Sequence, residues 1–158
     1  MKERSLSEIT LRKYEKPYNL SQRELLKKIC LSLGLLQPGD SRDIVVDILQ
    51  VLFESRQEKR SLSLENIKEK VIKKRKNANL ELKGIADSNI RRQLKRLRDL
   101  FIVEKENNLY KISEFESLEN IFSKKIEKFH IANIIERIKE YLAALEKTAV
   151  NQQEQSKP

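Results

Sequence analysis

The segment from Ile44 to Phe53 constrains the fold most, because apolar residues occupy most of its positions. On a helix these side chains cover an arc too wide for a helix lying on a surface. After the Pro38-Gly39 turn, Asp40 or Ser41 can cap this helix, which we expect to end near Arg56. The sequence therefore predicts a central core helix containing Ile44, Val45, Ile48, Leu49, Val51, Leu52 and Phe53.

Further helices are predicted around this core, since the chain has only 3 Gly and 3 Pro in 158 residues. Ser21 and Glu24 have capping-box spacing, which predicts a helix from Gln22 to Leu33. Ser63 can cap another helix, from Leu64 to about Lys74. We expect residues 1–18 to form an arm and residues 19–113 to form one domain.

A basic helix is predicted from Ser88 to Leu100, where Ile90, Leu94 and Leu97 form one apolar stripe. It ends the most basic part of the chain, because residues 59–98 hold 14 Lys and Arg against 4 Asp and Glu. Such a concentration attracts a polyanion by steering and counterion release. The alternative interpretation is a solvated, lysine-rich helix surface.

A β-hairpin should follow this helix, with Asn107-Asn108 as its two-residue turn. This turn places Lys105 opposite Tyr110, Glu104 opposite Lys111 and Val103 opposite Ile112. The long connection between the two preceding helices, residues 77–87, contains Leu80, Leu82 and Ile85, so we expect it to pack or to add a small strand.

The C-terminal segment is predicted to be a long helix over residues 114–147, beginning near Ser117. Its apolar residues repeat at alternating spacings of three and four, as in a short coiled-coil seam: Ile131, Ile134, Ile138, Tyr141 and Leu145. This pattern suits a homodimer through residues 117–147, and a helix that folds back on its own domain is the alternative. We expect residues 148–158 to be a disordered tail.

The order of a helix, a basic helix and a short hairpin over residues 44–113 resembles the winged helix-turn-helix family. The resemblance implies a mainly α domain with a small β-hairpin, in which Ser88 to Leu100 enters the major groove of double-stranded DNA. Within this helix we predict that the DNA-binding residues are Ser88, Asn89, Arg91, Arg92, Gln93, Lys95, Arg96 and Arg98. At the end of the preceding helix we predict phosphate contacts by Lys73, Lys74, Arg75 and Lys76. The wing carries Glu104 and Glu106 beside its tip, so we expect it to contribute little to binding.

The expected function is that of a cytoplasmic, nucleoid-associated, dimeric transcriptional regulator. The alternatives are a winged-helix interaction module in replication, transcription or chromosome machinery, and sequence-nonspecific nucleoid binding. An enzyme is not expected, because the sequence shows no phosphate loop, nucleophile elbow or paired carboxylates. We expect no cofactor and no metal, since Cys30 and His130 are the only residues of their types. No membrane segment is expected either.

Overall fold

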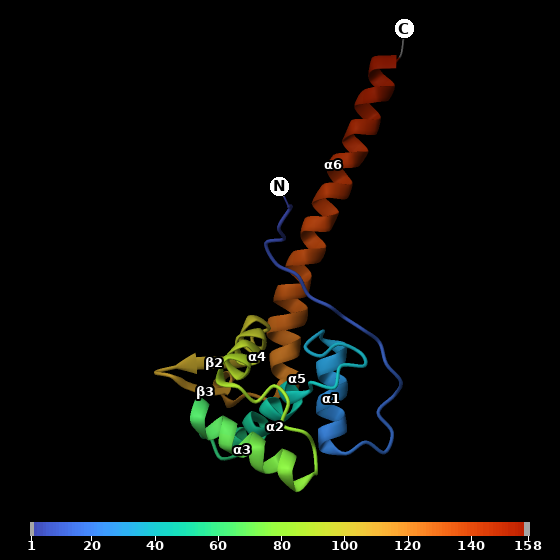
Figure 1. Cartoon of the computed structure of the whole chain (residues 1–158). Helices are drawn as coiled ribbons and strands as arrows, with labels where there is room; N and C mark the ends of the chain where they lie inside the picture. Colours follow the sequence, from blue (N-terminus) through green and yellow to red (C-terminus); the bar gives the residue numbers. More distant parts are fainter. Residues whose placement is uncertain (1, 157–158) are drawn as a thin grey trace.

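The computed structural model describes residues 2–156, which form a mainly helical molecule with one small antiparallel sheet (Figure 1). The first part of the chain forms α1 (Gln22–Ser32), α2 (Ile44–Gln57), β1 (Leu62–Ser63), α3 (Leu64–Asn77), α4 (Asp87–Asp99), β2 (Val103–Glu106) and β3 (Leu109–Ile112). The rest forms η1 (Ser113–Phe115), α5 (Leu118–Ile121), the π-helical segment η2 (Phe122–Ile131) and α6 (Ala132–Ser156). None of the helices in the described part is both long and apolar enough to cross a membrane.

Helix α2 is the central core helix that the sequence predicts. Nine of its residues are buried, and it packs against α1, α3, α4 and β3. It begins at Ile44, later than the predicted caps Asp40 and Ser41. Asp43 holds the N-cap position, but its side chain makes no capping hydrogen bond and instead pairs with Arg23 and Arg75. The helix start is therefore fixed by a tertiary contact.

Serine side chains cap three of the helices, and the caps at Ser21 and Ser63 were predicted from the sequence. The hydroxyl oxygens of Ser21, Ser63 and Ser117 accept hydrogen bonds from the backbone N–H groups three residues further on. Helix α3 continues to Asn77, three residues beyond its predicted end at Lys74. This extension brings Arg75 into the helix, on its buried side.

The hairpin has the predicted register, with Val103 opposite Ile112, Glu104 opposite Lys111 and Lys105 opposite Tyr110. Asn107 and Asn108 both have positive φ, 52° and 60°, as a type I′ turn requires. The sheet has a third strand, β1, which pairs Leu62 with Tyr110. This strand was not predicted, because two residues are too few to show alternation. The strand considered for the 77–87 connection is not present in the described chain, although Ile85 packs against the core.

The C-terminal helix leaves the domain and projects away from it (Figure 1). Ile121 and Ile126 are buried at its base, but no residue of α6 is buried. The alternative of a helix folded back on its domain is therefore wrong for α6. The helix also continues to Ser156, where a disordered tail from residue 148 had been expected. Residues 157–158 of that tail lie outside the described part.

The N-terminal arm is extended and follows α1 and the base of the C-terminal helix (Figure 1). The Arg12 guanidinium donates to the carbonyl oxygen of Leu31 at 2.9 Å, and Glu15 pairs with Lys28 at 2.6 Å. Nearer the start of the arm, the carbonyl oxygen of Glu8 lies 3.1 Å from a ring nitrogen of His130 in η2. The arm is thus attached to both helices.

Candidate nucleic-acid interface

Helix α4 has one buried face and one exposed face, and this division defines the candidate interface. Ile90, Leu94 and Leu97 are fully buried and anchor the helix to the core. The opposite side carries five exposed residues from the predicted set: Ser88, Arg91, Arg92, Lys95 and Arg98. Because these five side chains share one face of a rigid, anchored helix, a single surface presents several hydrogen-bond donors to solvent.

One carboxylate moderates the charge of this face. Lys95 lies 3.2 Å from Asp99 one turn later, and both side chains are largely exposed, so their pairing is weak and screened. Among residues 2–156, Arg91, Arg92 and Arg98 form no ion pair. The exposed face of α4 therefore keeps a net positive charge.

Asn89 and Gln93 do not belong to this exposed face, although both were predicted to read bases. The Asn89 amide donates to the carbonyl oxygen of Gly84 at 2.7 Å, and its oxygen accepts from Gln93 at 3.2 Å. Gln93 is only 7% exposed, and its own oxygen accepts from Arg96 at 2.9 Å. These amides tie the 77–87 connection to α4 and have little capacity left for a base edge.

Arg96 completes the same chain of hydrogen bonds. Its guanidinium donates to the carbonyl oxygen of Gly34 at 2.8 Å and so links α4 to the loop after α1. Burial and the neighbouring Arg92 charge both lower the pKa of Arg96. Arg96 is half-buried, so its first role in this structure is to connect α4 to the α1–α2 loop.

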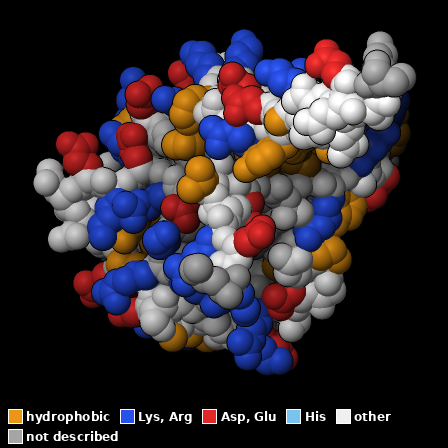
Figure 2. All heavy atoms as spheres, turned by 90° about the horizontal axis from the view of Figure 1, so that it is seen from above, with side chains coloured by type: hydrophobic (Ala, Val, Ile, Leu, Met, Phe, Trp, Pro, Cys, Tyr) orange, Lys and Arg blue, Asp and Glu red, His pale blue; other side chains and the backbone are white. Residues whose placement is uncertain are grey.

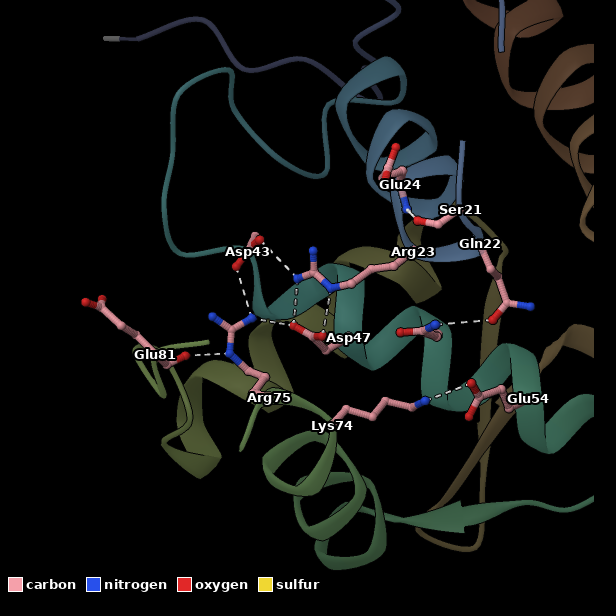
Figure 3. Close-up of polar contacts among 11 residues, drawn as sticks. Ser21, Gln22, Arg23, Glu24, Asp43, Asp47, Glu54, Lys74, Arg75 and Glu81 are labelled. Atoms are coloured by element: carbon pink, nitrogen blue, oxygen red, sulfur yellow. Dashed lines mark hydrogen bonds and ion pairs between the residues drawn. The ribbon is translucent and has the colours of Figure 1, made fainter. Parts of the chain in front are cut away.

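Arg75 is also misplaced in the prediction, because it lies inside the domain (Figure 3). The residue is 2% exposed, and its guanidinium contacts Asp43 at 3.0 Å, Asp47, and the carbonyl oxygen of Glu81. Arg23 approaches the same two carboxylates from α1, at 3.1 and 3.3 Å. We call Arg23, Asp43, Asp47 and Arg75 the buried ion network; it joins α1, α2 and α3.

The buried ion network keeps its charges through mutual contact. Burial on its own would raise the pKa of Asp43, but hydrogen bonds and charge from Arg23 and Arg75 outweigh it and hold that pKa below its ordinary value. Burial would likewise lower the pKa of Arg23, and the two carboxylates reverse this effect and raise it. These contacts favour the charged forms of Asp43 and Arg23. Arg75 is paired with carboxylates inside the domain and is not available to a DNA phosphate.

The neighbouring lysines of α3 differ in their surroundings. Lys73 and Lys76 are exposed, as a phosphate contact requires. Lys74 is half-buried, and its ammonium group pairs with Glu54 at 2.7 Å (Figure 3). Of the four predicted phosphate contacts, Lys73 and Lys76 alone are exposed.

On the face of the molecule seen from above, basic side chains are mixed with acidic ones (Figure 2).

The hairpin presents little positive charge. Lys111 pairs with Glu104 at 3.3 Å, and the Lys105 ammonium lies 5.5 Å from the ring centre of Tyr110. The Glu104 carboxylate also accepts from the backbone N–H of Glu114 at 2.9 Å. These contacts join the two strands of the hairpin to each other and to η1.

Arg42 is a candidate that was not predicted from the sequence. It is exposed in the α1–α2 loop and lines a hollow beside the start of α4, together with Arg92 and Arg96. An isolated arginine in a loop gives no periodic or motif signal. Only the folded chain brings it next to α4.

The structure offers no alternative site of metal or thiol chemistry in residues 2–156. No three His, Cys, Asp or Glu side chains there are grouped so that they could hold a metal ion. Cys30 is fully buried, and burial raises its pKa to about 12, so its thiol is protonated at neutral pH.

In comparisons with known proteins, no protein family, no curated protein and no solved structure matches the chain.

Proposed function

We propose that the chain is a DNA-binding protein of the winged helix-turn-helix type that acts as a dimeric transcriptional regulator. The observation that carries the proposal is the exposed face of α4, where Arg91, Arg92, Lys95 and Arg98 lie opposite a fully buried apolar stripe. A helix of this kind fits the major groove, which is about 12 Å wide.

The order of elements supports the same proposal. Helix α2, strand β1, helices α3 and α4 and the hairpin follow one another, and β1 joins the hairpin in one sheet. This arrangement extends the resemblance on which the expectation was based. The proposed interface is revised, however, because Asn89, Gln93, Lys74 and Arg75 are occupied within the fold.

The revised interface assigns different tasks to the exposed cations. Arg91 and Arg92, near the start of α4, read base edges, since arginine pairs with guanine in two hydrogen bonds. Lys95, Arg98, Lys73 and Lys76 neutralise phosphates and fix the position of the helix on the duplex. The hairpin, with its acidic residues, adds little binding energy.

The projecting helix supports dimerisation. Ile138, Tyr141 and Leu145 are 53%, 71% and 61% exposed, and they lie on one side of α6. An isolated helix with so much apolar surface in water is stabilised when a second copy covers it. Two copies joined in this way would present two α4 helices to one duplex.

Selection of bound sequences from random duplex DNA tests the proposal. We expect enrichment of an inverted repeat, because a two-fold dimer contacts two equivalent half-sites about one helical turn, or a multiple of it, apart. Binding without enrichment would favour nonspecific nucleoid binding. A failure to bind duplex DNA, together with a stable protein partner on the exposed side of α6, would favour the interaction module.

A further inference from the structure

A hollow of about 570 Å³ lies beside the start of α4, between the α1–α2 loop and the connection that precedes α4. Three of the residues that line it are arginines: Arg42 from the loop, and Arg92 and Arg96 from α4. The α1–α2 loop and α4, which are far apart in the sequence, thus both place positively charged side chains at this hollow. We call these three residues the arginine cluster.

The arginine cluster has no carboxylate partner within residues 2–156. The contacts of Arg92 and Arg96 are with neutral oxygens, at 3.4 Å from Asn89, 2.9 Å from Gln93 and 2.8 Å from Gly34. Asp40 is the one acidic residue in the lining. Its carboxylate accepts from the backbone N–H of Arg42 at 2.9 Å and so serves the loop itself.

Three other partly or fully buried cations of the chain are paired with anions. Arg23, Lys74 and Arg75 are each held against carboxylates. Desolvating a cation without an anion is unfavourable, so the fold usually compensates it. Arg96, the half-buried member of the arginine cluster, has no such anion and contacts only neutral oxygens, as the half-buried Arg12 of the arm does. The neighbouring Arg92 charge further lowers the pKa of Arg96. An anion entering the hollow would relieve this repulsion.

The chemistry of the hollow suits a phosphate group. Guanidinium groups present paired N–H donors that match phosphate oxygens, and three of them can share one tetrahedral anion. Ala86, the N-cap of α4, has no side chain that could cap the first backbone N–H groups of the helix. These groups add donors at the same edge of the hollow.

We infer that the hollow binds one phosphate group, held by Arg42 and Arg92 with Arg96 behind them, and that in the complex this is a backbone phosphate of the bound duplex. The inference depends on the proposed function for the source of the phosphate. It adds the α1–α2 loop to the interface as a third contacting element. A single phosphate beside α4 would then fix the angle at which the helix enters the groove.

The test combines the Arg42→Ala variant with duplexes in which one phosphate at a time is replaced by a neutral methylphosphonate. With the unmodified chain, one position near the α4 contact should lower affinity about tenfold when neutralised. Arg42→Ala should lower affinity for the unmodified duplex by a similar factor at each half-site and should be less sensitive to neutralisation at that position, because Arg92 and Arg96 remain. Its slope of log affinity against log salt should be shallower by about 0.9 for each bound copy, or about 1.8 for the dimer. Arg42→Lys should restore part of the affinity.

The controls separate this inference from the proposed function. Arg42 is exposed, so its truncation should leave thermal unfolding unchanged, and Lys147→Ala on α6 removes the same charge far from α4. If Arg42→Ala binds and responds to every methylphosphonate as the unmodified chain does, the inference is wrong while the proposed function stands.

A second arm applies if no duplex binds at all, a result that would overturn the proposed function. Pyrophosphate is then titrated into the unmodified chain and into Arg42→Ala. Saturable binding that Arg42→Ala loses would retain the phosphate site and assign it to a free phosphate ligand. Absence of saturable binding, or equal binding by the variant, would overturn the inference.

Discussion

At the scale of single residues, Arg75 shows how a charged side chain can be structural within a basic run. It follows Lys73 and Lys74 in the sequence, yet it lies one turn after Val71 and two turns after Ile67 on the buried stripe of α3. Helical phase would therefore have identified it. A helix that ends at Lys74 leaves Arg75 without a helical phase, so its sequence neighbours alone do not distinguish it from Lys73, Lys74 and Lys76.

Replacing Arg75 with alanine should destabilise the fold strongly. The substitution leaves Asp43 and Asp47 buried with one cation in place of two, so we expect the free energy of unfolding to fall by about 3–5 kcal/mol. Urea denaturation measures this change. Lys76→Ala, one residue away on the exposed side, should stay within about 0.5 kcal/mol of the unmodified chain. Similar values for the two variants would show that the buried ion network is unimportant.

The same network predicts a specific dependence of stability on pH. The folded pKa of Asp43 lies below its unfolded value, so the unfolded state binds more protons in acid and stability rises with pH. The contribution is complete above the unfolded pKa, about 3.9, and is lost as pH falls through the lowered folded value. In chemical denaturation between pH 7 and pH 2, Asp43→Asn should flatten this acid limb. An unchanged acid limb would contradict the assignment.

At the scale of elements, the hairpin was the most predictable part of the fold. Two asparagines that accept positive φ, the Glu104 and Lys111 pair and the alternation of apolar residues all specify one register. The start of α2 and strand β1 were not predictable in this way, since both depend on tertiary partners. Asn89 and Gln93 illustrate the same limit for the site. Their amide side chains suit base reading, but they bond to a loop carbonyl, to each other and to arginines of α4.

Gly84 is the position where the connection before α4 depends on its residue type. Its φ is +83°, and a Cβ atom there would lie 2.9 Å from the Asn89 amide nitrogen. Gly39 has a similar φ, +80°, but a Cβ atom there would meet no other atom within 4 Å. Each Gly→Ala change should lower the free energy of unfolding by about 1 kcal/mol for the backbone conformation.

Gly84→Ala should cost more than Gly39→Ala, because it also displaces the Asn89 side chain that joins this connection to α4. Thermal unfolding of the two variants gives the comparison, and the difference between them reports on the Asn89 contact. Equal losses would show that this hydrogen bond contributes nothing to the stability of the domain.

At the scale of the whole molecule, the projecting helix α6 is the element whose apolar side chains are most exposed to solvent. Its exposed apolar residues were predictable from their spacing, but whether they lie against the domain was not, because a surface helix and a dimer helix share that spacing. The structure places α6 away from the domain (Figure 1). Dimerisation is the proposal that accounts for this exposure.

Charged substitutions on α6 should therefore change the assembly state. We expect Ile138→Glu with Leu145→Glu to convert a dimer to a monomer in sedimentation velocity, since two carboxylates would enter the seam. Lys147→Glu, on the opposite side of the same helix, should leave the dimer intact. A chain that is monomeric before substitution, or a double variant that remains dimeric, would contradict the proposed seam.

The central claim is that the exposed face of α4 binds duplex DNA. The most direct test measures the affinity of the double variant Arg91→Ala with Lys95→Ala for the selected duplex. Its control for charge is Lys139→Ala with Lys147→Ala, which removes two exposed positive charges from α6. The account predicts at least a tenfold loss for the double variant, little change for the control, and a salt slope near −4 to −5 for each bound copy with about five phosphate contacts, or about −9 for the dimer. Equal affinities for the double variant and the unmodified chain would contradict it.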